Sequence, residues 1–149
     1  QSGANYTVSA TENTNETTGR TGTLVVTQEG SGAKSITINL SQPKATVAYT
    51  YNLTSNPSRV EFVATGETKT LSISSTKQKT VNGKNSGSPV AVNYTTTVSG
   101  TGFSKGTTEY SVVAAVNTGT VREGSAVVKQ SEGTKQITIT LSQAAGTSA

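Results

Sequence analysis

The side chains of this chain that could do chemistry are almost all carboxylates. Its acids are eight glutamates, and the sequence contains no aspartate, histidine or cysteine. Serine and cysteine nucleophile arrangements, the common zinc ligand sets and the usual calcium loops therefore lack essential members. Two glutamates about 5–10 Å apart could still cleave a glycosidic bond. These glutamates stand mostly beside turns or on polar strand faces, so we expect no enzyme, no metal site and no cofactor.

Sugar recognition is the other chemistry to consider, and it needs an exposed aromatic ring surrounded by polar groups. Phe103 follows the turn sequence Gly100-Thr101-Gly102, which predicts a ring exposed in a loop. The polar segment 77–88 is the one insertion long enough to serve as a recognition loop. The candidate ligand-binding residues are Phe103, Lys77, Lys79, Asn82, Lys84 and Asn85.

The net charge of +4 raises the question of a nucleic-acid partner. The twelve Lys and Arg residues are spread from Arg20 to Lys135, whereas a phosphate-binding surface needs several cations in one place. No stretch approaches the roughly 20 apolar residues that cross a bilayer. We therefore expect neither nucleic-acid binding nor membrane insertion.

The elements that must position the candidate residues are strands. Apolar residues make up 31% of the chain, and they alternate with Thr and Ser at a period of two, with no helical period over ten or more residues. Tyr49 and Tyr51 share a face with Val47 and Leu53, which predicts that their rings lie in the core. Other alternating sets are Ile36, Ile38 and Leu40; Ile137, Ile139 and Leu141; Val60, Phe62 and Ala64; Leu71 and Ile73; and Val90, Val92 and Tyr94. The pattern predicts an all-β fold, and a sandwich rather than a barrel.

An internal repeat divides the chain. Four ordered blocks recur at an offset close to 102 residues, as between Arg20 and Arg122. They are 6–10 with 110–114, 19–22 with 121–124, 24–28 with 126–130, and 34–42 with 135–143. We therefore expect residues 1–44 to be the C-terminal half of an immunoglobulin-like repeat, residues 45–145 to be a complete one, and residues 146–149 to be a tail or linker.

A half-repeat cannot cover both faces of its sheet by itself. One interpretation is that truncation or processing of a longer protein removed the rest. The alternative is strand donation between neighbouring subunits, in which another segment or chain completes residues 1–44.

The closing part of each repeat carries a family resemblance. It consists of Arg-x-Gly, a hydrophobic strand and a final strand that ends in Ser-Gln, at residues 20–42 and again at 122–143. With the segment 60–75 ahead of the second copy, this order resembles BACON, the Bacteroidetes-associated carbohydrate-binding often N-terminal domain, and similar bacterial or phage immunoglobulin-like modules. The family typically carries a Trp after the strand equivalent to residues 71–75, where this chain has Thr76-Lys77-Gln78. The resemblance therefore transfers no binding residue.

The resemblance implies an extracellular, cell-surface or virion-surface protein. We expect a structural or adhesion module of a surface or virion fibre protein, which spaces or displays a distal function and makes weak glycan contacts. The expected partners are cell-surface or mucin glycans and neighbouring copies of the chain. A dedicated carbohydrate-binding module and a fimbrial or virion subunit that assembles by strand exchange are the alternatives.

Overall fold

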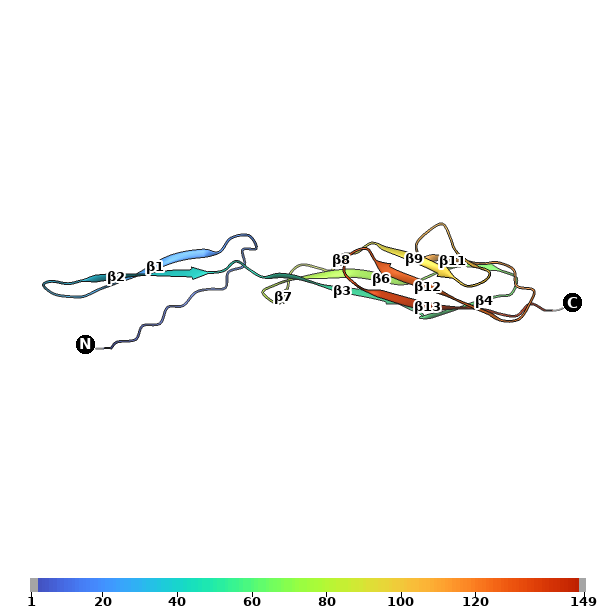
Figure 1. The fold of residues 1–149 in the computed structure, drawn as a ribbon, viewed down its shortest axis with the longest axis horizontal. Coiled ribbons are helices and arrows are strands. Elements are labelled where there is room, and N and C mark those ends of the chain that lie inside the picture. Colours follow the sequence, from blue (N-terminus) through green and yellow to red (C-terminus); the bar gives the residue numbers. More distant parts are fainter. Residues whose placement is uncertain (1–2, 148–149) are drawn as a thin grey trace. The chain divides into compact units, whose positions relative to one another are not determined.

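The computed structural model describes residues 3–147, and these are all-β, as the alternation predicts. These residues contain no helical segment that could span a membrane. The strands are β1 (Arg20–Thr27), β2 (Ser35–Gln42), β3 (Val47–Ser55), β4 (Arg59–Phe62), β5 (Glu67–Thr70), β6 (Ile73–Val81), β7 (Lys84–Asn85), β8 (Val90–Ala91), β9 (Tyr94–Ser99), β10 (Phe103–Lys105), β11 (Ser111–Ala114), β12 (Arg122–Gln130) and β13 (Gln136–Gln143) (Figure 1).

The chain forms two compact units. Within the described residues, the first contains residues 3–48 and 79–86, and the second contains residues 49–78 and 87–147. Segment 79–86, which we expected within the complete repeat 45–145, therefore groups with the N-terminal residues.

The second unit contains a four-stranded sheet in the order β4-β13-β12-β9 and a three-stranded sheet in the order β10-β11-β5. β11 is antiparallel to β10 and to β5, and β12 is antiparallel to β13 and to β9, whereas β4 is parallel to β13. Both sheets contribute alternate side chains to one core, which is consistent with a β-sandwich. Its buried members are Leu53, Val60, Phe62, Leu71, Phe103, Val112, Ala114, Ala126, Val128, Ile139 and Leu141.

Two expectations about individual strands are wrong. Val90, Val92 and Tyr94 do not line one strand, because Val90 in β8 pairs with β6 whereas Tyr94 in β9 pairs with β12. The chain changes partners between them, and the Val92 amide donates to the Ser75 carbonyl. Tyr49 is 49% exposed rather than in the core, and the Lys77 ammonium lies 5.3 Å from the centre of its ring.

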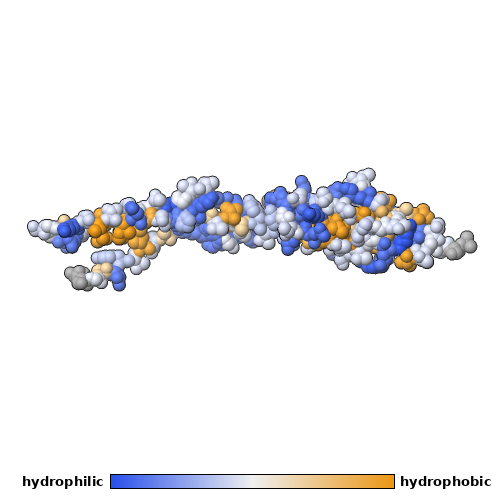
Figure 2. All heavy atoms as spheres, viewed as in Figure 1, coloured by the Kyte–Doolittle hydropathy of each residue, from blue (hydrophilic) through white to orange (hydrophobic). Residues whose placement is uncertain are grey.

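In the first unit, β1 and β2 form a two-stranded antiparallel sheet. Its register repeats that of β12 and β13: Leu24 pairs with Ile38, as Ala126 pairs with Ile139. Ala126, Val128, Ile139 and Leu141 on the inward face of β12 and β13 are buried, but Ile38 on the equivalent face is 43% exposed. Figure 2 shows hydrophobic residues gathered on the surface of this hairpin.

A buried asparagine closes each copy of this hairpin. In the second unit, the Asn117 side-chain amide donates to the Ala144 carbonyl at 2.8 Å. In the first, Asn13 donates to the Pro43 carbonyl at 2.9 Å. Both side chains are almost fully buried, and each also accepts a backbone N–H two residues further along the chain.

An arginine and a glutamine complete the same arrangement in the second unit. Arg122 Nε donates to Gln143 Oε1 at 3.0 Å, and its Nη2 donates to the Ala115 carbonyl at 2.9 Å. Gln143, which is fully buried, donates from Nε2 to the carbonyls of Val63 and Ala115 at 2.9 and 2.7 Å. We call Asn117, Arg122 and Gln143 the closing clamp.

The first unit builds a corresponding clamp from Asn13, Arg20 and Gln42. Gln42 Nε2 donates to the Thr11 carbonyl at 2.9 Å, and Arg20 Nη1 donates to Thr11 Oγ1 at 3.2 Å. The same three residue types thus fasten β1–β2 and β12–β13 to the segment that precedes each hairpin.

Candidate functional site

Most of the glutamates lie in surface ion pairs. Among residues 3–147, no group of three or more His, Cys, Asp or Glu side chains could hold a metal ion. Seven glutamates contact a lysine or arginine: Glu12 with Lys84, Glu16 with Lys79, Glu61 and Glu123 with Arg59, Glu67 with Lys69, Glu109 with Lys105, and Glu132 with Lys77.

Segment 77–88, expected to be a recognition loop, is largely a β-hairpin instead. β6 runs on to Val81 and pairs with β7, with Asn82 and Gly83 in the turn. Both turn residues have positive φ, 49° and 79°, the conformation that Asn-Gly favours in two-residue hairpins. The sequence signal for this hairpin was the Asn-Gly pair.

Three of the predicted binding residues converge on the N-terminal segment of the first unit. Lys79 Nζ lies 2.6 Å from a Glu16 carboxylate oxygen, and Lys84 Nζ lies 2.7 Å from Glu12. Asn82 donates to Glu12 at 3.1 Å and accepts the Thr46 amide at 2.9 Å. These side chains thus bond the tip of hairpin 79–86 to Glu12, Glu16 and Thr46 of the same unit.

The other two polar residues of the predicted set make different contacts. Lys77 belongs to the second unit, where its ammonium pairs with Glu132 at 2.5 Å, and this hydrogen bond raises the pKa of Lys77. Asn85 is exposed in β7 and pairs with Thr80. The structure therefore does not gather the six predicted residues into one site.

The expectation that Phe103 is exposed is wrong, since Phe103 is only 8% exposed. Its ring packs edge-on against Phe62, with the ring centres 5.6 Å apart. The ring fits there because Gly124 on the neighbouring β12 has no side chain: a Cβ at Gly124 would lie 2.7 Å from the ring. Phe103 is thus a core residue and offers no sugar platform.

Glu12 makes the attachment of hairpin 79–86 dependent on pH. Hydrogen bonds from Lys84 and then Asn82 hold the Glu12 pKa below its ordinary value of 4.5. A lowered pKa in the folded state stabilises the fold above the ordinary value, and this contribution is lost as the pH falls through the folded-state pKa.

We therefore expect the amides of β7 to lose exchange protection between about pH 5 and pH 3. Hydrogen exchange corrected for the intrinsic pH effect measures this, and Glu12→Gln should show weak protection at both pH values. Protection of β7 that is equal in the variant and the parent at pH 5 would contradict it.

A polar groove of about 630 Å³ in the second unit offers an exposed ring. Tyr110 lies there beside hydroxyl side chains and Lys105, whose ammonium is 2.5 Å from Glu109. Hydrogen bonds from Lys105 and from the Thr96 amide lower the Glu109 pKa, so this carboxylate is charged at neutral pH. The sequence alone does not reveal the groove, because its lining comes from three separate segments, residues 68–70, 105–108 and 110–113.

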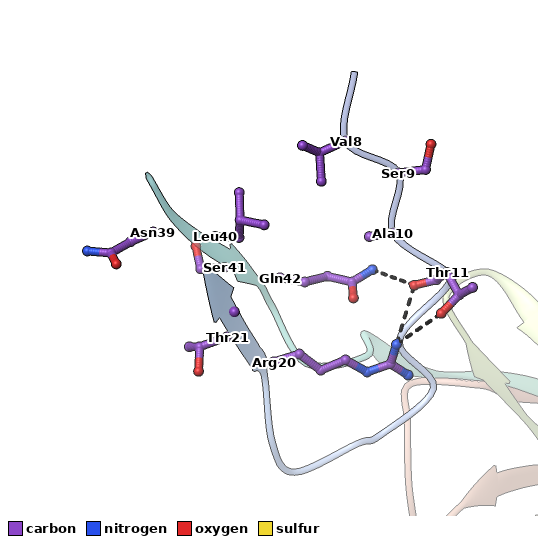
Figure 3. Close-up of a pocket in the computed structure, with 11 residues that line it drawn as sticks. Val8, Ser9, Ala10, Thr11, Arg20, Thr21, Asn39, Leu40, Ser41 and Gln42 are labelled. Atoms are coloured by element: carbon purple, nitrogen blue, oxygen red, sulfur yellow. Dashed lines mark hydrogen bonds between the residues drawn. The ribbon is translucent and has the colours of Figure 1, made fainter. Parts of the chain in front are cut away.

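The first unit has a groove of similar volume, about 630 Å³, between residues 8–11 and the β1–β2 hairpin. In Figure 3, Val8 and Leu40 lie on opposite sides of it, and Arg20 and Gln42 bond to Thr11 at one end. Gly22 lines the groove without a side chain. This groove is the more apolar of the two and follows the uncovered face of the hairpin.

Comparisons with known proteins identify no relative. The chain matches no protein-family model, no curated protein and no solved structure. The two grooves and the repeated hairpin are therefore the features from which a function can be inferred.

Proposed function

We propose that this chain is a non-enzymatic, immunoglobulin-like repeat module of a surface or virion fibre protein, where it spaces or displays a distal function. In this proposal residues 45–145 form one complete repeat, and residues 1–44 are the C-terminal half of a preceding one. The main support for the proposal is that the closing clamp occurs twice. The first unit builds it from Asn13, Arg20 and Gln42, and the second unit builds it from Asn117, Arg122 and Gln143.

The clamp supports a structural role because the buried polar network that it forms in the second unit fixes one backbone arrangement. Each clamp ties the ends of a hairpin to the segment before it through backbone carbonyls, which do not depend on the side chains of that segment. Repeats built in this way tolerate sequence change on their surfaces while keeping their shape. The resemblance of the closing segments to BACON-like modules agrees with this role.

Immunogold labelling tests the proposed location. An antibody raised against the whole chain should label intact cells or virions of the source at their surface, without permeabilisation. Label that appears only after the cells are opened, or after the virions are disrupted, would refute a surface or fibre role.

The second candidate function is carbohydrate binding, and the Tyr110 groove is the observation that favours it. An aromatic ring packs against the C–H face of a sugar, while the neighbouring hydroxyl and ammonium groups can bond its hydroxyls. Tyr110 is 46% exposed, which leaves one part of its ring accessible.

A glycan array separates the two candidates. The structural proposal predicts no micromolar binding by the intact chain. Micromolar binding that is lost in Tyr110→Ala and kept in Tyr6→Ala would establish the carbohydrate-binding function instead. Tyr6 is the matched control because it holds the equivalent position in the repeat but does not line the Tyr110 groove.

A further inference from the structure

The second unit shows what covers the equivalents of β1 and β2. There, β4 lies parallel to β13, with Val60 opposite Leu141. On the other side, β9 lies antiparallel to β12, with Val98 opposite Ala126. The part of the chain that the structure describes places no strand beside β2 or β1 in these positions, since β1 and β2 form a sheet of two.

The inward face of the β1–β2 hairpin keeps the apolar side chains that such strands would cover. Ile38 corresponds to Ile139, which is fully buried, and Leu40 corresponds to the fully buried Leu141. On β1, Val26 corresponds to Val128. In the first unit all three of these apolar residues keep part of their surface in solvent. Retaining them on an open face is costly unless something covers that face.

Gly22 identifies the kind of side chain that is missing. Its counterpart Gly124 must be glycine, because a Cβ there would lie 2.7 Å from the Phe103 ring and 2.5 Å from the Ser99 carbonyl oxygen. A Cβ at Gly22 would meet no described atom within 4 Å. The space above Gly22, which we call the glycine hollow, is therefore open. In the second unit the Phe103 ring and the Ser99 carbonyl occupy the equivalent space.

The hydrogen bonds of Gln42 indicate that the same segment is missing. Gln143 donates to two carbonyls, those of Ala115 and of Val63, which directly follows β4. Gln42 donates to Thr11, the counterpart of Ala115. The counterpart of the Val63 carbonyl would come from a strand beside β2.

We propose that the open face of the β1–β2 hairpin binds a partner segment from outside residues 1–149, namely the front half of a repeat of the same type. The partner places one strand parallel to β2, as β4 lies on β13, and another antiparallel to β1, as β9 lies on β12. It inserts an aromatic ring over Gly22 and presents a small side chain to Leu24, since the second unit has Ala126 at that position. Main-chain bonds to the free strand edges supply affinity, and these pockets supply specificity.

A second folded copy of this chain does not fit as the partner. Its β4 and β9 already belong to its own sheet, and Val60 and Phe62 of β4 are buried in its own core. Lending them would open that core. The partner must instead carry a front half that has no hairpin of its own. This inference rests on the repeat in the proposed function, but not on a surface location.

A fusion supplies the partner segment at high effective concentration. A second copy of residues 45–104 is joined ahead of residue 1 of the full chain, in repeat register because Tyr6 matches Tyr110. The fusion carries Leu24→Ala, which matches Ala126 and removes the clash expected with this particular segment.

Hydrogen exchange then compares β1 and β2 in the fusion and in the unfused chain with Leu24→Ala. We expect exchange of these strands to slow by at least about 100-fold in the fusion. Unchanged exchange there, with β12 and β13 still protected as the folding control, would overturn the proposal.

Gly22→Val distinguishes insertion at the hollow from general compaction. In the unfused chain this change should leave exchange of β1 and β2 unaltered, because the added atoms have open space. In the fusion it should abolish the gain, because valine occupies the position of the aromatic ring. Equal protection of the fusion with and without Gly22→Val would contradict the assigned geometry.

Sedimentation that shows the unfused chain as a dimer with a protected hairpin would also overturn the proposal, in favour of self-association.

Discussion

Replacing Ile139 by alanine is expected to lower the free energy of unfolding of the second unit by about 2–5 kcal/mol. Ile139 is fully buried among core residues from both sheets, so the change removes apolar contacts and leaves a cavity. The equivalent change Ile38→Ala should cost less than about 1 kcal/mol, since Ile38 keeps 43% of its surface in solvent.

Urea unfolding followed by circular dichroism measures both variants. Because the two residues hold the same position in equivalent hairpins, intrinsic strand preference is the same in both, and the difference reports burial alone. Equal losses in the two variants would mean that the β1–β2 face is covered in solution.

Gln143→Ala is expected to destabilise the second unit by about 2–4 kcal/mol, because it leaves buried groups without partners. The side chain accepts from Arg122 Nε and donates to the carbonyls of Val63 and Ala115. These groups lie where water cannot easily replace the amide, since Gln143 is fully buried.

Gln42→Ala is the matched control for the clamp, and it should cost under about 1 kcal/mol because water can reach the groups it frees. Thermal unfolding of both variants gives the comparison. A Gln143→Ala variant as stable as Gln42→Ala would show that the clamp does not hold the second unit together.

The all-β fold could be predicted from the sequence because the alternation of apolar residues is a local property. Ile139 and Leu141 are buried on one face, as their spacing predicts. The Asn82-Gly83 turn could be predicted for the same reason, since both residues favour positive φ.

The candidate site could not be predicted, because its contacts join residues far apart in the chain. Lys84 and Lys79 pair with Glu12 and Glu16 across more than 60 residues, and nothing local marks these partners. Phe103 follows a glycine-rich turn that suggests exposure, yet its place in the core depends on Gly124 of β12. The Arg-x-Gly motif contained this glycine, but only the paired strands show what it accommodates.

One hairpin occurs twice in this chain, covered in the second unit and open in the first. Hydrogen exchange of the intact chain at neutral pH, resolved to the segments 35–42 and 136–143, measures this difference. We predict that segment 136–143 exchanges at least about 1,000-fold more slowly than segment 35–42, because opening it requires unfolding of the core. Equal protection of the two segments would contradict the claim.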